Sequence, residues 1–389
     1  MNTVDVTRGH ARRLLILISW AAVTGCFGTD GEAFRETTWY GDADSTATWN
    51  VEDDASLCSD CIVVKRVAVI GDSTAEGLVV ETHEVTQDSV GRYWVGQRER
   101  IKVFSPTGEW IKTIGRPGRG PFEFVMAKPL YTDTKRRVHV IDPGNAREMV
   151  YGDDLSPLLE RRIPAGDPFD VVAIDDGEGY VMNMWLQSAT GAGLAFHRVR
   201  GGDVVQSFGI PDNGEPASSF TSQRHLAVDT AGRLFAAQRF SFDIDARNSE
   251  GGRITRITGP VLNEKPVRAG VYDATDNPLP NEIVAIRVDQ RARLWIVSRW
   301  VRSNWNSFMT QRVFPNGMVG LVLKPGATID SLAYTRLEVV DLQKRRVVAR
   351  LDHPGILTEF IGDDQLLENW TDEDGIPHVV VWRVSARLP

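Results

Sequence analysis

A phrase that recurs about six times along the chain constrains its fold more than any other feature. Its clearest copy spans residues 85–124 and contains four short apolar segments separated by turn residues. A unit of this kind cannot bury both of its faces alone, so tandem units must pack on one another. The first half of the unit is an apolar strand, an aspartate, a small or basic turn and a second apolar strand. Its aspartates recur 42 to 60 residues apart, at Asp88, Asp133, Asp175, Asp229 and Asp289, with a degenerate sixth copy at Gly362. This spacing exceeds that of a β-hairpin and predicts a four-stranded blade with loops of variable length.

The residues within each copy favour turns followed by strands. Aspartate bonds readily to the backbone that follows it, and glycine adopts positive φ without steric cost. The next residues, such as 93–95 and 294–296, are β-branched, aromatic or aliphatic, which is typical of strands buried on both faces. The sequence therefore predicts an all-β fold that grows by adding blades.

Residues 100–124 resemble an NHL repeat, and residues 62–389 as a whole resemble bacterial six-bladed β-propellers of that family. The resemblance implies a six-bladed β-propeller of four-stranded antiparallel blades. It also implies that a strand from the N-terminal end closes the last blade, and residues 62–70 are the best candidate. Closure removes exposed sheet edges that would otherwise pair with other chains.

The N-terminus has the layout of a secretory signal, with basic residues before a short apolar run over residues 14–22. The run ends in Val23, Thr24, Gly25 and Cys26, which resembles the lipobox of bacterial lipoproteins. That resemblance implies a signal peptide over residues 1–25 and a lipidated Cys26 in the bacterial cell envelope. Because Phe27 rather than aspartate follows, family habit favours the outer membrane, facing the periplasm or the exterior. An ordinary signal peptide with a chance cysteine is the alternative.

Between the signal and the propeller, we expect an acidic flexible tether over residues 26–60. Residues 27–60 carry nine acidic residues against one basic residue, and they are rich in Thr, Asp, Gly and Ala. Three aromatic residues are unusual for a pure linker and leave docking on the propeller open: Trp39, Tyr40 and Trp49. The propeller is then expected over residues 61–389.

Charge and cysteine content limit the function classes. The net charge is −8 and the predicted propeller is nearly neutral, which opposes general nucleic-acid binding. Cys58 and Cys61 form a Cys-x-x-Cys pair, and in an exported chain a local disulfide is the leading interpretation. No second pair exists for zinc, and no βαβ context supports a thioredoxin-like role.

Two features favour catalysis without completing a catalytic site. Gly71, Asp72 and Ser73 follow an apolar strand and resemble the first block of SGNH hydrolases, with Ser73 as nucleophile, yet the other blocks of that family are missing. His83 and His225 precede repeat aspartates on predicted inner strands, and both could face a central channel. Two histidines do not make a metal site, so we predict no catalytic residue and no metal ligand.

Candidate binding residues are arginines and tryptophans in loops between second and third strands, which open around the channel on one face. The fifth repeat carries an unusually long insertion over residues 298–334. Exposed Trp and Arg dominate recognition hot spots. The alternative is an extra hairpin or lid that packs its aromatic residues onto the ring. The candidates are Arg98, Arg239, Arg299, Trp300, Arg302 and Trp305.

The sequence thus predicts a lipid-anchored binding module that displays a surface for a protein or small-molecule ligand on one face. A metal-assisted hydrolase or lyase at the propeller axis is the alternative, with an esterase acting through Ser73 behind it. No cofactor is expected. Calcium binding is left as an alternative, although no sequence motif supports it.

Overall fold

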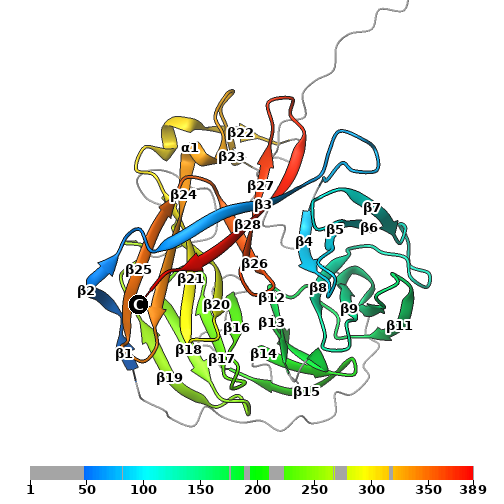
Figure 1. Cartoon of the computed structure of the whole chain (residues 1–389), viewed down its shortest axis with the longest axis horizontal. Coiled ribbons are helices and arrows are strands. Elements are labelled where there is room, and N and C mark those ends of the chain that lie inside the picture. Colours follow the sequence, from blue (N-terminus) through cyan, green and yellow to red (C-terminus); the bar gives the residue numbers. More distant parts are fainter. Residues whose placement is uncertain are drawn as a thin grey trace, which may run out of the picture.

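Six small antiparallel sheets surround one axis in this computed structural model and form a six-bladed β-propeller (Figure 1). The structure describes residues 48–80, 82–174, 177–187, 193–209, 223–265, 267, 278–314 and 319–388. The first strands of each blade follow chain order outward from the axis, and in blades 4 to 6 a strand from the N-terminal part of the chain is added at the rim. The predicted all-β, six-bladed fold is confirmed.

The first three blades are built from consecutive strands. Blade 1 contains β4 (Thr82–Gln87), β5 (Tyr93–Gln97), β6 (Arg100–Phe104) and β7 (Trp110–Ile114). Blade 2 contains β8 (Lys128–Thr132), β9 (Val138–Asp142), β10 (Arg147–Tyr151) and β11 (Pro157–Arg162). Blade 3 contains β12 (Asp170–Ile174), β13 (Gly179–Gln187), β14 (Gly193–Arg200) and β15 (Asp203–Phe208).

The last three blades recruit strands from the N-terminal part of the chain. Blade 4 contains β16 (Arg224–Val228), β17 (Leu234–Gln238), β18 (Asp243–Arg247), β19 (Arg253–Thr258) and, at its rim, β1 (Thr48–Asn50). Blade 5 contains β20 (Glu282–Val288), β21 (Arg293–Val301), β24 (Ala333–Asp341), β25 (Arg346–His353) and, at its rim, β2 (Glu52–Cys58). Blade 6 contains β26 (Leu357–Ile361), β27 (Gln365–Thr371), β28 (Pro377–Ala386) and β3 (Ile62–Ile70) as its outer strand.

Strand β3 closes the ring as the sequence predicted. It pairs antiparallel with β28 along its length, from Ile62 opposite Ala386 to Ile70 opposite Val379. Gly108 in the β6–β7 turn packs directly on this strand: a Cβ at Gly108 would lie 2.0 Å from the carbonyl oxygen of Val69. The positive φ of Gly108 (+96°) gives a second reason for glycine at this turn.

The segment before β3 differs from the predicted tether at its C-terminal end, because Thr48–Cys58 belongs to the propeller. Strand β1 pairs parallel with β19, and β2 pairs parallel with β25. Trp49 packs against the core between blades 4 and 5, and Asp53 accepts two hydrogen bonds from the Arg350 guanidinium. Trp39, Tyr40, Cys26 and the predicted signal peptide lie outside the described residues. A disulfide joins Cys58 and Cys61 at the turn from β2 to β3.

The repeat aspartates hold the turn between the first two strands of a blade. In blade 1, Asp88 Oδ1 accepts hydrogen bonds from the backbone N–H of Val90 and Arg92. Its Oδ2 accepts from Arg92 Nε at 2.6 Å and from Trp94 Nε1 at 3.0 Å. Asp133, Asp229 and Asp289 each bond in the same way to the arginine four residues later. The Asp and the Arg therefore form one structural unit of the repeat.

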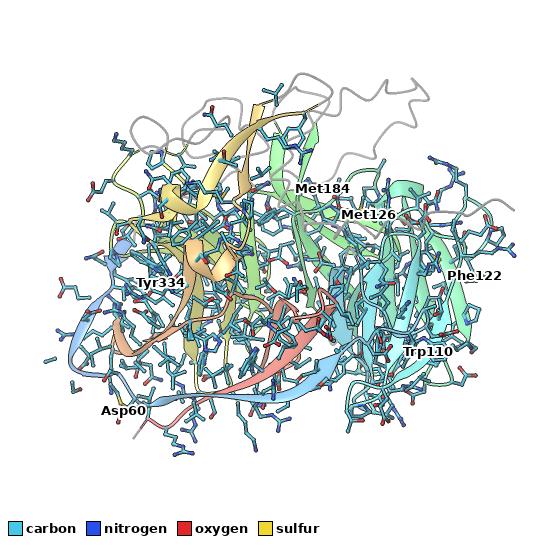
Figure 2. All side chains as sticks on the ribbon, turned by 90° about the horizontal axis from the view of Figure 1, so that it is seen from above. Asp60, Trp110, Phe122, Met126, Met184 and Tyr334 are labelled. Carbon is cyan, nitrogen blue, oxygen red and sulfur yellow. A yellow bond between two sulfur atoms is a disulfide. The ribbon has the colours of Figure 1, made fainter. Side chains whose placement is uncertain are left out.

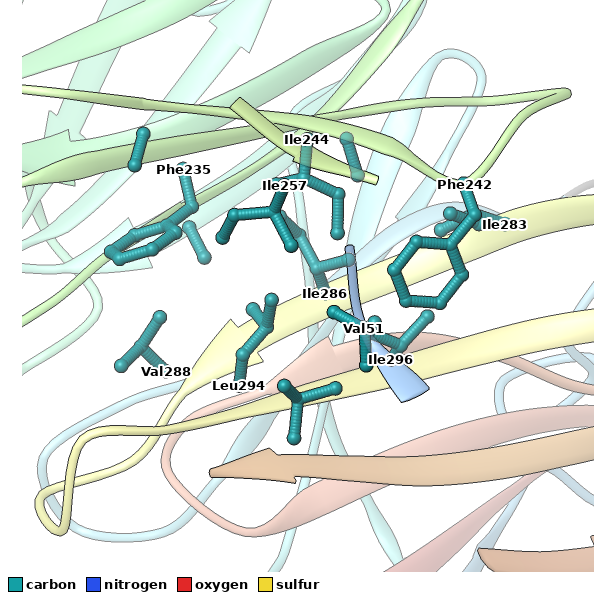
Figure 3. Packing of buried hydrophobic residues seen from close by; sticks show 14 of the residues in the cluster. Val51, Phe235, Phe242, Ile244, Ile257, Ile283, Ile286, Val288, Leu294 and Ile296 are labelled. Atoms are coloured by element: carbon teal, nitrogen blue, oxygen red, sulfur yellow. The ribbon is translucent and has the colours of Figure 1, made fainter. Parts of the chain in front are cut away.

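Apolar side chains fill the space between neighbouring blades. Figure 3 shows the cluster between blades 4 and 5, where Phe235, Ile244 and Ile257 meet Ile286 and Ile296. Burial of each such side chain contributes about 1.5–3 kcal/mol. Among the described residues no helix has the length and apolarity needed to cross a membrane.

The predicted insertion in blade 5 forms a small structure of its own between β21 and β24. It contains the 3-10 turn η3 (Trp305–Phe308), the hairpin of β22 (Met309–Val313) and β23 (Val319–Leu323), and the short helix α1 (Ile329–Leu332). In Figure 2 this hairpin, in yellow, extends beyond the ring on one face, together with the green ends of β13 and β14.

Candidate functional site: the axial channel

An open channel follows the propeller axis and has a volume of about 740 Å³. All six inner strands line it: β4, β8, β12, β16, β20 and β26, whose labels surround the centre of Figure 1. Every blade has four antiparallel strands from its inner to its outer strand, so every inner strand begins at the same face of the ring. Residues near the start of each inner strand therefore meet at one end of the channel.

This end of the channel gathers charged side chains from five blades, and we call it the acidic mouth. Glu84 comes from β4, Asp170 from the first position of β12 and Glu359 from β26. Asp167 lies in the loop before β12. Two further groups lie at the mouth: the Lys128 ammonium, at the first position of β8, and the His225 imidazole, in β16.

Lys128 connects three blades at the mouth. Its Nζ lies 2.7 Å from Asp167 Oδ1 and 4.0 Å from Glu84 Oε1. The lysine is largely buried, whereas Asp167 is exposed at the channel rim. The ion pair between them holds the ammonium in place. One lysine serves several carboxyl groups, which leaves the mouth with excess negative charge.

Glu84 and Glu359 form a carboxyl pair across the junction of blades 1 and 6. Their side chains are hydrogen-bonded to each other, which requires a proton on one of them. Burial raises the pKa of both groups, and the charge of Glu84 raises the pKa of Glu359 further. The Glu84 side chain keeps 31 % exposure because it faces the channel. The pair therefore retains a proton at pH values where isolated glutamates are ionised.

Asp170 and His225 form a second pair at the mouth. Asp170 Oδ2 accepts the backbone N–H of Leu226 at 2.9 Å and lies 3.5 Å from His225 Nδ1. The ring of Phe169 meets His225 edge-on, with centroids 4.9 Å apart. His225 thus lines the channel, as the sequence suggested. The side chain of His83, the other candidate, lies outside the part of the chain that the structure describes.

The carboxyl groups of the mouth are too spread out to form a preassembled metal site. Among the described residues, only Cys58, Asp60 and Cys61 bring three potential metal-ligand atoms within 4.8 Å of one another. Both sulfur atoms of that group are consumed by the disulfide. A metal in the channel would therefore have to draw the carboxyl groups together or bind through water.

Two of the sequence candidates, Arg239 and Arg299, meet at one buried carboxylate. Arg239 Nε donates to Glu282 Oε2 at 2.6 Å, Arg299 pairs with Glu282 Oε1, and Glu282 is 3 % exposed. The Arg239 guanidinium also lies over the rings of Phe169 and Phe240. These arginines lie at the rim beside His225, and Glu282 compensates one of their two positive charges.

Two further candidates, Trp300 and Arg302, lie at the base of the insertion in contacts within the chain. The Arg336 guanidinium stacks over Trp300 at 4.5 Å, and Trp300 Nε1 donates to Ser298 Oγ at 2.9 Å. Arg302 lies over the ring of Tyr334 at 5.4 Å and donates to the carbonyl oxygen of Asp330. Both side chains are half-buried at the surface of blade 5.

Trp305 differs from the expectation of an exposed recognition residue. It is 6 % exposed and packs with Leu332, Ala333 and Ile356 in a small core beneath the hairpin. The insertion therefore uses this tryptophan as an apolar core residue, as the alternative of a packed hairpin anticipated. Arg98 is exposed and lies apart from the other candidates, in the β5–β6 turn of blade 1.

The loop at Ser73 is a hydrogen-bonded turn. Asp72 Oδ1 accepts the backbone N–H of Thr74 at 2.7 Å and the Thr74 hydroxyl. The neighbouring His378 bonds to the Gly71 carbonyl oxygen through Nδ1 and to Asp372 through Nε2. Both ring nitrogens are thus engaged, and the all-β ring lacks the α/β fold of SGNH hydrolases. The weak resemblance at Gly71, Asp72 and Ser73 does not extend to a catalytic site.

The sequence reasoning missed five residues of the mouth: Glu84, Lys128, Asp167, Asp170 and Glu359. A signal existed for four of them, because Glu84, Lys128, Asp170 and Glu359 each lie three to five positions before the aspartate of their repeat copy, or before the glycine in its place in the sixth copy. All six inner strands carry a charged residue, so charge alone does not single out the mouth. A common position in the repeat, however, implies a common place around the axis.

No protein-family profile matches the chain, and no curated protein matches it in sequence. Solved structures share its fold. A candidate exported protein of Bacteroides fragilis superimposes with a TM-score of 0.53 at 12 % identity, over 87 % of this chain and 99 % of that one. A DUF4221 family member from Bacteroides vulgatus gives 0.47 at 8 % identity, over 85 % and 98 % of the chains. Virginiamycin B lyase from Staphylococcus aureus gives 0.43 at 11 % identity, over 83 % and 99 %. Identities this low describe the fold alone.

Proposed function

We propose that this protein is an extracytoplasmic, lipid-anchored binding propeller that takes a cationic small molecule into the acidic mouth of its channel. The observation that carries the proposal is the charge imbalance of the mouth. Glu84, Asp167, Asp170 and Glu359 converge there, opposed by Lys128 and the titratable ring of His225. A cationic ligand would supply the missing positive charge in a partly desolvated site, where charge-assisted hydrogen bonds are strong.

The shape of the site supports a small molecule as the ligand. A concave space of about 740 Å³ lies in the range of cofactor and ligand pockets. Apolar residues such as Phe169, Val172 and Phe360 share its lining with the charged groups. Apolar walls with a few placed polar groups are typical of ligand sites.

The proposed location rests on the N-terminal sequence and on two supporting features. The lipobox-like segment ending at Cys26 would supply the anchor, and the Cys58–Cys61 disulfide is consistent with an oxidising compartment. The similar fold of a candidate exported Bacteroides protein agrees with this location.

Calorimetric titration with spermidine, a small polycation, tests the proposed function. Binding should be saturable in the native protein and about tenfold or more weaker in the double variant Glu84→Gln/Glu359→Gln, because the ligand loses its ionisable partners. Glu109→Gln, an exposed glutamate of the same blade, is the control and should bind as the native protein does. Equal affinity in all three proteins would reject the acidic mouth as the binding site.

A metal-assisted hydrolase or lyase is the second candidate, favoured by the convergence of carboxyl groups and His225 from inner strands. Its residues would be Glu84, Asp170, His225 and Glu359. Elemental analysis of the purified protein should then find about one calcium or zinc per chain. A metal content far below this would leave ligand binding as the function of the channel.

A further inference from the structure

A second cavity, of about 390 Å³, lies in blade 1 and shares no lining residue with the axial channel. It is bounded by the loop that connects β3 to β4 and by the β5–β6 turn. Its charged lining is mainly basic, in contrast to the acidic mouth. The lining residues, which we call the blade 1 pocket, are Ala75, Leu78, Val80, Gln97, Arg98, Glu99, Arg100 and Lys102.

Lys102 places a buried positive charge in the pocket without a carboxylate partner. It is 5 % exposed, and its Nζ donates to the carbonyl oxygens of Leu78 at 2.8 Å and Ala75 at 3.1 Å. An ammonium has three donors, so two carbonyl groups do not saturate it. Burial, and then the nearby charge of Arg100, lower the pKa of Lys102. A buried ammonium of this kind is costly unless an anion compensates it.

Arg98 and Arg100 add two guanidinium groups at the rim of the pocket. Both are exposed, and neither forms an ion pair with any described residue. This distinguishes them from Arg92, Arg239 and Arg299, which all pair with carboxylates. The two guanidinium groups are therefore available to a ligand.

Three acidic groups lie in or near the pocket, but only one of them belongs to its lining, and the other two act on Lys102 from the adjacent loop. Glu99 is the acidic residue of the lining, and Glu76 is on the adjacent loop. Asp72 is turned toward its own loop, where it accepts from the backbone N–H and the hydroxyl of Thr74. The lining itself therefore has two positive charges in excess.

We propose that the blade 1 pocket binds a small anion that bears a carboxylate or a phosphate group. The Lys102 ammonium acts as a point charge at the base, and the planar forks of Arg98 and Arg100 suit the paired oxygens of either group. The volume accommodates an organic anion rather than a bare ion alone. This site is separate from the channel, opposite in charge, and independent of the proposed function.

Titration with two probes tests this proposal: inorganic pyrophosphate for the phosphate class and citrate for the carboxylate class. Both are added to the full chain in HEPES buffer, with sodium chloride of equal ionic strength as the reference. At least one probe should bind saturably and raise the melting temperature above the chloride reference. The probe that binds more tightly assigns the ligand class.

The variant Arg98→Gln/Arg100→Gln should weaken binding of that probe about tenfold or more, because it removes both forks from exposed positions. Lys112→Gln removes one positive charge from the exposed outer strand of the same blade and should leave the affinity unchanged. Lys102→Met, if it folds, should also lose binding. The proposal is overturned if neither probe binds, or if the double arginine variant binds as tightly as the native protein.

Discussion

At the scale of single residues, charged side chains in this propeller divide into two groups by their partners. The repeat aspartates at 88, 133, 229 and 289 each bond to a turn and to the arginine four residues on. The carboxyl groups of the acidic mouth have no arginine of this kind. Glu84 and Glu359 instead bond to each other, and both pKa values rise. The first group stabilises the blades, whereas the second faces the channel, where we propose that a ligand binds.

The carboxyl pair should make stability depend on pH. A carboxyl group whose pKa is raised by folding stabilises the folded state fully when the pH is below its ordinary pKa, here 4.5. This stabilisation is lost as the pH rises through the raised pKa of the folded state. The substitution Glu359→Gln places a side-chain amide beside Glu84, which can donate a hydrogen bond to it and does not ionise. We expect the melting temperature of the native protein to fall more steeply between pH 5 and pH 8 than that of the variant.

Between pH 5 and pH 8, the free energy of unfolding of the native protein should fall by roughly 1–2 kcal/mol more than that of Glu359→Gln. Thermal unfolding followed by circular dichroism at both pH values measures this difference. Glu109→Gln, at an exposed position, should follow the native curve. Parallel curves for the native protein and Glu359→Gln would contradict the shared proton.

At the scale of elements, two segments show where the ring gains strands beyond its repeats. Strand β3 was predictable, because an apolar run over residues 62–70 precedes the first repeat and an open ring would leave an unpaired edge. Strands β1 and β2 were not predicted. Their acidic composition suggested a linker, yet backbone pairing with β19 and β25 requires few apolar side chains, and Arg350 compensates Asp53.

Ring closure by β3 should be sensitive to the backbone of Val69, which pairs with Val380. Val69→Pro removes an N–H and distorts the strand, and we expect a loss of about 3 kcal/mol or more in the free energy of unfolding. Val69→Ala keeps the backbone and should cost much less. Urea denaturation compares the two, and similar losses would contradict closure through this strand.

The insertion of blade 5 should depend on Trp305 as a core residue. Trp305→Ala removes the largest side chain of its small cluster and should cost about 3–5 kcal/mol of local stability. Hydrogen exchange should then accelerate in β22 and β23 while the inner strands of the ring stay protected. Trp110→Ala, at a residue with 38 % exposure, is the control and should leave exchange nearly unchanged. Unchanged exchange in Trp305→Ala would favour a role in recognition instead.

At the scale of the whole molecule, the ring brings together residues that are far apart in the chain. Glu84 and Glu359 meet only because blade 6 closes against blade 1, and Lys128, Asp170 and His225 come from three intervening blades. Periodicity predicted the blades, since every copy repeats the same local pattern. It did not predict the mouth, because each of the five contributing blades supplies only one or two titratable residues, which look isolated in sequence. The site exists only at the level of the closed ring.

The central claim is that this closed ring presents a cation-binding mouth, and proton release on binding tests it most directly. A cation beside the Glu84–Glu359 pair favours full ionisation and should expel the shared proton. Calorimetry with spermidine between pH 5 and pH 8 should therefore give different binding enthalpies in two buffers that take up protons with different heats, over the pH range in which the pair holds its proton. Saturable binding with a buffer-dependent enthalpy that disappears in Glu84→Gln/Glu359→Gln is the predicted result. No binding, or identical enthalpies in both buffers, would contradict the claim.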